Sequence, residues 1–359
     1  MSQPYSMQEW VFREAHGKYD IDLGDSNAPC IKAGIFSADI EDLVLDYGTD
    51  RGSHALAQQV ATLYGIERCN VGIAHGAQEA LYLLYRTLLN VGDHVITFSP
   101  GWQQSWKVPE EIGCSISILE YDASFKVSAS AVQDALRTNT RVIILNNPCN
   151  PTGKSIDAGE LRKVVEVARE RNIFVIADEE YLTDIKSSVI HFEFDNVIAV
   201  SGVSKIFGVP GIRIGWMCGP KDIVAKAMDY KHLTTISNSV ICEKIAERIL
   251  HNYDGLLSDY LQLCSNGYEV LQQWSRDCFP MLEVVAPEGT PFCWVHLTSS
   301  ESSLDFCRRV LHQTRVLTMP AEVFGQRNGM RITFARPVDE LRDGLGRIKS
   351  EFKYALSMY

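Results

Sequence analysis

From about residue 50 to about residue 260, apolar runs of strand length alternate with amphipathic stretches of helix length. The strand-like runs are residues 70–73, 94–98, 116–121, 141–145, 173–177, 197–200 and 214–218. Helical periodicity covers residues 78–89, 129–137, 158–171 and the stretch after residue 221. Strands joined by helices in this way pair mostly in parallel, with helices on both faces. The sequence therefore predicts an α/β fold with a mostly parallel, seven-stranded sheet.

The last part of the chain has a different character. A long amphipathic helix is expected at residues 255–274, and short strands and helices follow it. The expected strands are residues 282–285, 292–296 and 331–334, and the expected helices are residues 304–313 and 338–354. A further short helix is expected at residues 7–16. We therefore expect a large domain of residues 36–268 and a smaller α+β domain of residues 1–35 and 269–359.

The composition limits the classes of binding partner and the cellular compartment that we expect. The chain has 359 residues, a formal net charge of -11 and 34 scattered Lys and Arg residues, so no nucleic-acid partner is expected. Residues 1–14 lack a basic stretch followed by an apolar one, so we expect no secretory signal, and no apolar run reaches the roughly 18 residues of a membrane span. The ten cysteines form no C-x-x-C pair, which speaks against a zinc or redox motif. We expect a cytoplasmic protein with reduced thiols, no metal and no membrane partner.

The segment from Ser201 to Gly215 sets a lysine and an arginine in a context that suits a charged ligand. Lys205 comes just after a strand-like run and a serine–glycine turn, and Arg213 lies between two glycines. A partly desolvated lysine near a fixed cation can lose its proton and form a Schiff base. An arginine can hold a phosphate dianion through its planar fork. These are the two anchors that pyridoxal phosphate (PLP) needs, and an ordinary loop with one exposed lysine is the alternative.

Four more unusual segments follow strand-like runs, and ligands of α/β sheets bind at the carboxyl ends of strands. Gly76, Ala77 and Gln78 open a helix, where exposed N–H groups and the helix dipole favour a phosphate. Trp102 follows the next strand-like run. It can stack on a flat heterocycle, although a tryptophan in such a place is also common in the core of a domain interface.

The other two segments carry amides and a carboxylate. The turn from Asn146 to Gly153 holds three asparagines and two prolines, and its amides can donate to an oxygen of a ring or substrate. Asp178 lies at the end of a buried strand, where a carboxylate is costly unless it is paired. A protonated pyridine nitrogen is a suitable partner. The alternatives are a metal site or a solvated acidic turn, but no histidine accompanies the carboxylates.

In this order, the segments resemble the fold-type I PLP-dependent enzymes of the class I/II aminotransferase superfamily, over about residues 20–350. The most specific parts are residues 147–153, residues 178–181, and Ser204-Lys205 with residues 211–215. The resemblance implies that Lys205 carries the Schiff base and later moves the substrate α-proton. It also implies that Asp178 pairs with the pyridine nitrogen.

The resemblance implies further contacts with PLP. Tyr181 and Asn150 would bond the ring hydroxyl oxygen, and Trp102 would stack on the ring. The phosphate would be bound by Gly76, Ala77, Gln78 and Arg213, with Ser204 beside the lysine. Lys205, Asp178 and Tyr181 are thus the expected catalytic residues, and Asn150 and Trp102 are also expected to face the substrate.

Two more positions fit the resemblance, and several depart from it, among them Gly76 and Gln78, where relatives have hydroxyl residues, and Cys149, which is often polar in relatives. Tyr47 resembles a tyrosine that reaches the phosphate of the neighbouring subunit, which implies a homodimer with shared active sites. Arg331 resembles the arginine that binds the substrate α-carboxylate in a fork. Gly202 stands where the family often has a serine that bonds the phosphate. The loop at residues 24–27 and the segment at residues 100–104 also differ, which leaves substrate choice open.

The resemblance implies an aminotransferase that acts on an α-amino acid and a 2-oxo acid. The same residues would serve a PLP-dependent lyase, a β- or γ-replacement enzyme, or a cyclising enzyme similar to capreomycidine synthase. A PLP-sensing domain of a transcription regulator would need a winged-helix module before residue 20, and we expect no room for one. A nicotinamide dehydrogenase is disfavoured because no strand-like run is followed by G-x-G-x-x-G.

Overall fold

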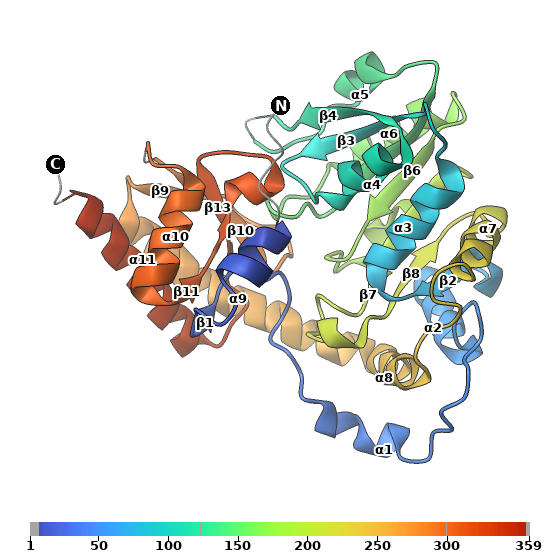
Figure 1. The fold of residues 1–359 in the computed structure, drawn as a ribbon, viewed down its shortest axis with the longest axis horizontal. Coiled ribbons are helices and arrows are strands. Elements are labelled where there is room, and N and C mark those ends of the chain that lie inside the picture. The colour runs from blue at the N-terminus through green and yellow to red at the C-terminus, as the bar shows by residue number, and fades with distance from the viewer. Residues whose placement is uncertain (1–6, 123, 299, 357–359) are drawn as a thin grey trace.

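The computed structural model describes residues 7–122, 124–298 and 300–356, and its main element is a seven-stranded sheet (Figure 1). The strands lie side by side in the order β2 (Val71–Ala74), β8 (Gly215–Cys218), β7 (Val197–Gly202), β6 (Phe174–Asp178), β5 (Thr140–Asn146), β3 (His94–Ser99) and β4 (Ser115–Glu120). Strand β8 is antiparallel to both of its neighbours, and the other pairs are parallel. The mostly parallel, seven-stranded sheet predicted from the sequence is confirmed.

Helices cover both faces of this sheet because its central strands are apolar on both sides. In β5, Val142 and Ile144 pack into the core under α3 (Gly76–Leu88) and α7 (Lys221–Lys231). Ile143 and Leu145 pack into the opposite core with α6 (Ala158–Arg169) and α5 (Ala129–Ala135). All four side chains are buried, as expected for a strand whose successive residues face two covered layers.

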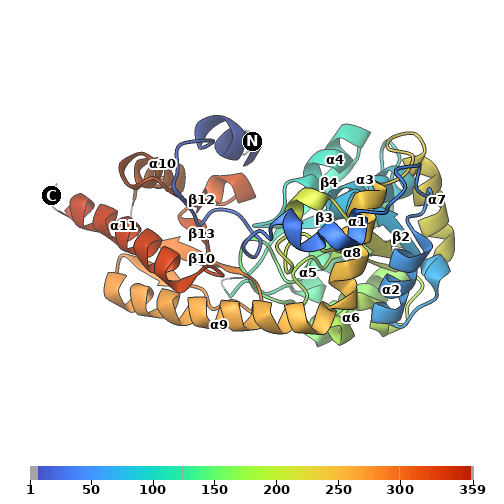
Figure 2. The same ribbon diagram turned by 90° about the horizontal axis from the view of Figure 1, so that it is seen from below.

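A second, smaller sheet is antiparallel and lies in the C-terminal part of the chain. Its strands have the order β12 (Met319–Pro320), β13 (Gly329–Thr333), β10 (Phe292–Leu297) and β9 (Leu282–Val284). Helices α10 (Ser303–Thr314) and α11 (Val338–Leu356) belong to this part. Figure 2 shows α9 (Tyr253–Cys278) extending from α8 (Val240–His251), beside the large sheet, to the small sheet.

The N-terminal segment lies against the small sheet. Strand β1 (Ile21–Asp22) pairs in parallel with β11 (Val316–Leu317), and the buried Trp10 donates its indole N–H to the Thr318 carbonyl at 2.9 Å. The short helix expected at residues 7–16 is present, with a π-helical turn at Glu9–Glu14. Among the described residues, no helix has both the length and the low polarity that a bilayer span requires.

Helices α2 (His54–Tyr64) and α4 (Gln104–Ile112) of the large-sheet region were not expected from the sequence. Helix α2 begins after Ser53, whose Oγ accepts from the Leu56 N–H, and it ends at Gly65 with φ +65°. These are ordinary N-cap and C-cap signals. Helix α4 contains Pro109 and has few apolar residues, so its periodicity is weak.

Gly267 provides a test of the packing of α9. A Cβ at this position would overlap the carbonyl oxygen of Phe334, which follows β13. We therefore expect Gly267→Ala to lower the free energy of unfolding by about 1–3 kcal/mol, because the helix has to move away. Gly255→Ala is the control in the same helix, since nothing lies within 4 Å of its Cβ. Chemical denaturation of both variants checks the prediction, and equal stabilities would contradict the close packing.

Candidate active site

A cavity lies at the edge of the large sheet where its parallel strands end. The residues that line it are Ser26, Ala77, Gln78, Leu81, Trp102, Gln104, Asn146, Asn150, Asp178, Glu180, Tyr181, Ser204, Lys205 and Arg213. The residues come from the ends of several strands, from the first turn of α3 and from the N-terminal loop. Nine of the residues predicted from the sequence are therefore brought together by the fold.

The strand order explains why three charged residues share this cavity. Lys205 follows β7 and Asp178 ends β6, and these neighbouring strands run parallel. Arg213 precedes β8, and because β8 is antiparallel to β7, its first residue lies at the same edge of the sheet. Three adjacent strands thus supply a lysine, a carboxylate and an arginine to one site.

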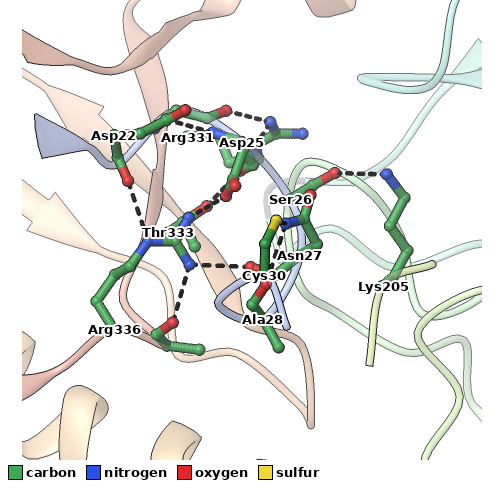
Figure 3. A network of polar contacts seen from close by, with 12 residues as sticks. Asp22, Asp25, Ser26, Asn27, Ala28, Cys30, Lys205, Arg331, Thr333 and Arg336 are labelled. Carbon is green, nitrogen blue, oxygen red and sulfur yellow. Dashed lines mark hydrogen bonds and ion pairs between the residues drawn. The ribbon is translucent and has the colours of Figure 1, made fainter. Parts of the chain in front are cut away.

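Lys205 is held beneath the N-terminal loop. Its Nζ donates to Ser26 Oγ at 3.3 Å, as Figure 3 shows, and its carbonyl accepts from the Ala28 N–H at 2.9 Å. Gly208 has φ +62°, and a Cβ there would overlap the carbonyl oxygen of Pro29. The loop therefore packs directly on the segment that carries the lysine.

Gly76, Ala77 and Arg213 form the part of the site that suits an anion. Gly76 opens α3 with φ +75°, and a Cβ at this position would lie 2.5 Å from Arg213 Nη2. Glycine is therefore needed for the guanidinium to lie against the first turn of the helix. Ala77 and Gln78, the next residues of that turn, line the cavity. Backbone N–H groups at a helix N-terminus next to an arginine provide a phosphate site.

The carboxyl group of Asp178 suits a cationic partner. Burial, and then the charge of Glu180, raises the pKa of Asp178, while the Glu180 backbone N–H and Lys205 oppose the rise. A buried carboxylate is stabilised by a nearby positive charge. A protonated ring nitrogen at this position would supply that charge and keep Asp178 ionised.

Asn150 joins the cavity to Arg331. The Asn150 side chain donates to the Tyr181 hydroxyl at 3.4 Å and accepts from Arg331 Nη1 at 2.6 Å. Arg331 lies in β13 and is 2% exposed. Its Nη2 donates to the carbonyls of Gly24 and Asp25 in the N-terminal loop (Figure 3). Arg331 does not itself line the cavity, and it contacts the cavity wall through Asn150 while the chain's own oxygens occupy its fork.

Arg336 holds the same loop in place. It forms an ion pair with Asp25 and donates to the carbonyls of Asp22 and Asn27 (Figure 3). Burial raises the pKa of Asp25, and the charge of Arg336 opposes this rise. The guanidinium of Arg336 thus bonds the protein's own oxygens and fixes the loop.

Tyr47 and Cys149 do not line the cavity. Tyr47 is 83% exposed and lines a separate hollow with Gly48 and Ser237, so its predicted contact with a second subunit stays a prediction. Cys149 is buried, and its Sγ lies 3.6 Å from the carbonyl oxygen of Pro100. Burial raises the pKa of the Cys149 thiol, which disfavours the reactive thiolate.

Several residues of the cavity were not singled out from the sequence. They are Ser26, Leu81, Gln104, Asn146 and Glu180. Asn146 and Glu180 belong to segments that the sequence predicts to lie near the ligand. The sequence does not show, however, that their side chains point into the cavity. Ser26 comes from a loop that is remote in the sequence, so no local pattern links it to Lys205.

The residues of the cavity fit PLP. Gly76 lets the Arg213 guanidinium lie against the first turn of α3, where both can face a phosphate, and a protonated ring nitrogen beside Asp178 would stabilise the charge that burial disfavours. Lys205 lies between these two features in the lining of the cavity, and Trp102 provides an aromatic surface. The cavity therefore contains residues that could hold each group of the cofactor: aldehyde, phosphate, ring nitrogen and ring face.

Comparisons with known proteins agree with this geometry. The family model described as aminotransferase class I and II matches residues 15–348. The chain is 26% identical to capreomycidine synthase from Streptomyces vinaceus, covering 77% of this chain and 73% of that protein. It is 29% identical to a probable N-acetyl-LL-diaminopimelate aminotransferase from Bacillus subtilis, covering 77% and 72%.

The fold is also similar to a solved structure of this kind. A PLP-dependent aminotransferase from Streptococcus suis superimposes with a TM-score of 0.92 at 25% identity, covering 99% of each chain. The family match spans both sheets and all the strand ends that form the cavity. The chain belongs to the class I and II aminotransferases, a family of enzymes that use pyridoxal 5'-phosphate.

Proposed function

We propose that this protein transfers an amino group from an α-amino acid to a 2-oxo acid, with Lys205, Asp178 and Tyr181 as catalytic residues. The observation that supports this most is the placement of Lys205, Asp178 and Arg213 on three adjacent strand ends, with Arg331 bonded to Asn150 beside them. Bound PLP supplies an aldehyde that takes up the amino group and a ring that withdraws electrons from the substrate. The chain itself has to hold both molecules and move protons.

Each catalytic residue has a defined task in this proposal. Lys205 binds the cofactor covalently through Nζ, and once an incoming amine releases it, the same nitrogen moves the α-proton of the substrate. Asp178 holds the proton at the ring nitrogen. The Tyr181 hydroxyl and the Asn150 amide, 3.4 Å apart, both bind the ring oxygen.

The remaining cofactor residues position PLP. Trp102 provides the surface on which the ring stacks, and it faces the substrate together with Asn150. Arg213 and the first turn of α3, with Gly76, Ala77 and Gln78, hold the phosphate. Ser204 is 2% exposed and lies next to Lys205 in the cavity wall, where its hydroxyl can bond the phosphate.

Arg331 receives the substrate α-carboxylate in this proposal. Its guanidinium now bonds Asn150 Oδ1 and the carbonyls of Gly24 and Asp25. A carboxylate that binds the fork has to replace these two carbonyls, so substrate binding displaces part of the N-terminal loop. Ser26 follows these residues and bonds Lys205, so the same displacement reaches the catalytic nitrogen.

We further propose a homodimer in which Tyr47 reaches the phosphate of the partner's site. Several large apolar side chains are exposed near Tyr47, at fractions of 78% for Val44, 70% for Leu45 and 52% for Ile236. Residues 45–48, Thr235 and residues 237–241 line one hollow, which places these segments together on the surface. A group of exposed apolar side chains of this kind suits an interface between subunits.

Two proposals concern the whole chain. Residues 36–268 form the large domain, and residues 1–35 with 269–359 form the small one, with the boundary inside the continuous helix α9. Residues 1–6, 123, 299 and 357–359 of this division lie outside the described residues. A cytoplasmic location is supported by the ten cysteines, all of which are unpaired.

A second candidate function is cyclisation, elimination or replacement on an amino acid. It is supported by the similarity to capreomycidine synthase, at 26% identity over 284 residues. The cavity residues named above would serve this chemistry equally, because it uses the same cofactor and begins with loss of the same α-proton.

An absorbance titration separates the two functions. We expect a suitable amino acid to convert the PLP-loaded protein to the aminated cofactor, which persists until a 2-oxo acid is added. A cyclising or eliminating enzyme would instead return to its starting spectrum without a 2-oxo acid. Borohydride reduction and peptide mapping should place the pyridoxyl group on Lys205, with Lys205→Ala as the unlabelled control. A label on another lysine would refute the site.

Arg331→Lys tests the carboxylate site. Lysine cannot form the two parallel hydrogen bonds of the fork, so we expect the substrate to bind about 1–3 kcal/mol more weakly. PLP affinity should stay unchanged. Substrate and cofactor titrations measure both quantities, with Arg347→Lys as a control because Arg347 pairs with Asp343 at the surface. Equal losses for substrate and cofactor would show that Arg331 is structural.

Subunit mixing tests the role of Tyr47. Tyr47→Phe and Lys205→Ala, each inactive or strongly impaired alone, are mixed and allowed to exchange subunits. A mixed dimer then has one intact site, because its tyrosine and lysine come from opposite chains. Random pairing makes half of the dimers mixed, so activity should recover towards a quarter of that of the unmodified protein. No recovery after exchange has been shown by tagged subunits would place Tyr47 outside the partner's site.

A further inference from the structure

Glu180 is a buried acid of the active site to which the proposed reaction assigns no task. It lines the cavity together with Asp178, Lys205 and Arg213. Its Oε1 is buried and has no hydrogen-bond partner among the described residues. A buried carboxylate oxygen without a hydrogen-bond partner is costly, so nearby positive charges are needed to stabilise it.

The carboxyl group of Glu180 is linked to the absence of a side chain at residue 202. A Cβ on Gly202 would lie 3.0 Å from Glu180 Oε1 and 2.9 Å from the Ile214 carbonyl oxygen. Gly202 is the last residue of β7, and Lys205 follows three residues later. The carboxyl group of Glu180 therefore lies against Gly202, at the end of the strand that precedes the lysine. A side chain at residue 202 would crowd it.

Two cations favour the ionised form of Glu180 against the effect of its burial. Asp178, Glu179 and Tyr181 neighbour it on its own segment, Lys205 approaches from the end of β7, and Arg213 approaches from the start of β8. Burial raises the pKa of Glu180, and the two cations Lys205 and Arg213 oppose that rise. Lys205 Nζ itself bonds Ser26 Oγ, so Glu180 acts on it across the cavity and not through a direct hydrogen bond. Such interactions are screened less in a buried site than in water.

We propose that the Glu180 carboxylate is the counter-charge of the Lys205 nitrogen and determines the pH at which that nitrogen keeps its proton. Asp178 is not available for this task, because it is committed to the ring nitrogen. Glu180 is thus a positioning residue that acts through Lys205. The proposal rests on the attachment of PLP to Lys205, and it assigns a purpose to Gly202.

A pH titration of the absorbance of the PLP-loaded protein tests this. The bound cofactor changes colour when the nitrogen that links it to Lys205 loses its proton. Glu180→Gln removes the negative charge and destabilises the cationic nitrogen, so the midpoint should move to lower pH. Glu180→Asp keeps the charge and should stay closer to the unmodified protein. Glu110→Gln is the control, since Glu110 is an exposed residue of α4 that pairs with Lys107, and its midpoint should not move.

A second measurement needs no cofactor. In the cofactor-free protein, an acylating reagent modifies Lys205 only when its amine is neutral, and peptide mapping gives the rate at this residue. We expect Lys205 to react several-fold faster in Glu180→Gln than in the unmodified protein when both are labelled at the same near-neutral pH. This measurement also decides the question if Glu180→Gln binds PLP poorly.

The outcomes separate this proposal from the assignment of Lys205. If Glu180→Gln has the circular dichroism spectrum of the unmodified protein and neither its midpoint nor its labelling rate changes, the counter-charge is refuted while Lys205 keeps its role. If borohydride places the cofactor on another lysine, both ideas fail. A midpoint that moves in Glu180→Gln and is restored in Glu180→Asp supports the proposal.

Discussion

The direction of one strand determines which charges meet in this protein. Strand β8 is antiparallel to β2 and β7 in a sheet whose other pairs are parallel. If β8 ran parallel, Arg213 would lie at the opposite edge, some four residues of extended strand away from Lys205. Its reversal places the arginine beside the first turn of α3, where a phosphate can be held by both. The cofactor site therefore depends on a topological feature as much as on the residues themselves.

Glycines then allow these charges to approach the backbone. Gly76 leaves room for the guanidinium of Arg213, and Gly202 leaves room for the carboxyl group of Glu180. A Cβ at Gly76 would overlap the Arg213 guanidinium, and a Cβ at Gly202 would press on the Glu180 carboxyl group and overlap the Ile214 carbonyl oxygen. The loop from Asp22 to Asn27 is held in a related way, because two buried guanidinium groups need oxygen acceptors and its backbone supplies them.

The sequence predicted the sheet well because each strand is an apolar run that ends in a polar turn. The seven observed strands begin and end within a few residues of the predicted ones, and most of the predicted site residues line one cavity. Two-residue strands such as β1 and β11 have no periodicity to detect, since they depend on pairing between remote segments. Ser26 and Glu180 were not predicted for a similar reason: the partner of the first is remote, and the direction of the second depends on space left at Gly202.

The bonds that Arg331 already makes turn substrate binding into an exchange. Its Nη2 bonds two carbonyls of the N-terminal loop, and its Nη1 bonds Asn150. A carboxylate that enters gains only the difference between its own hydrogen bonds and those it replaces, because both terminal nitrogens of the guanidinium already have acceptors. The displaced carbonyls have to find water or other donors, so the cost appears in the loop and not at the arginine. Measured affinities would then report on the loop as well, and a change at Asp22 or Arg336, remote from the substrate, would alter binding without touching it.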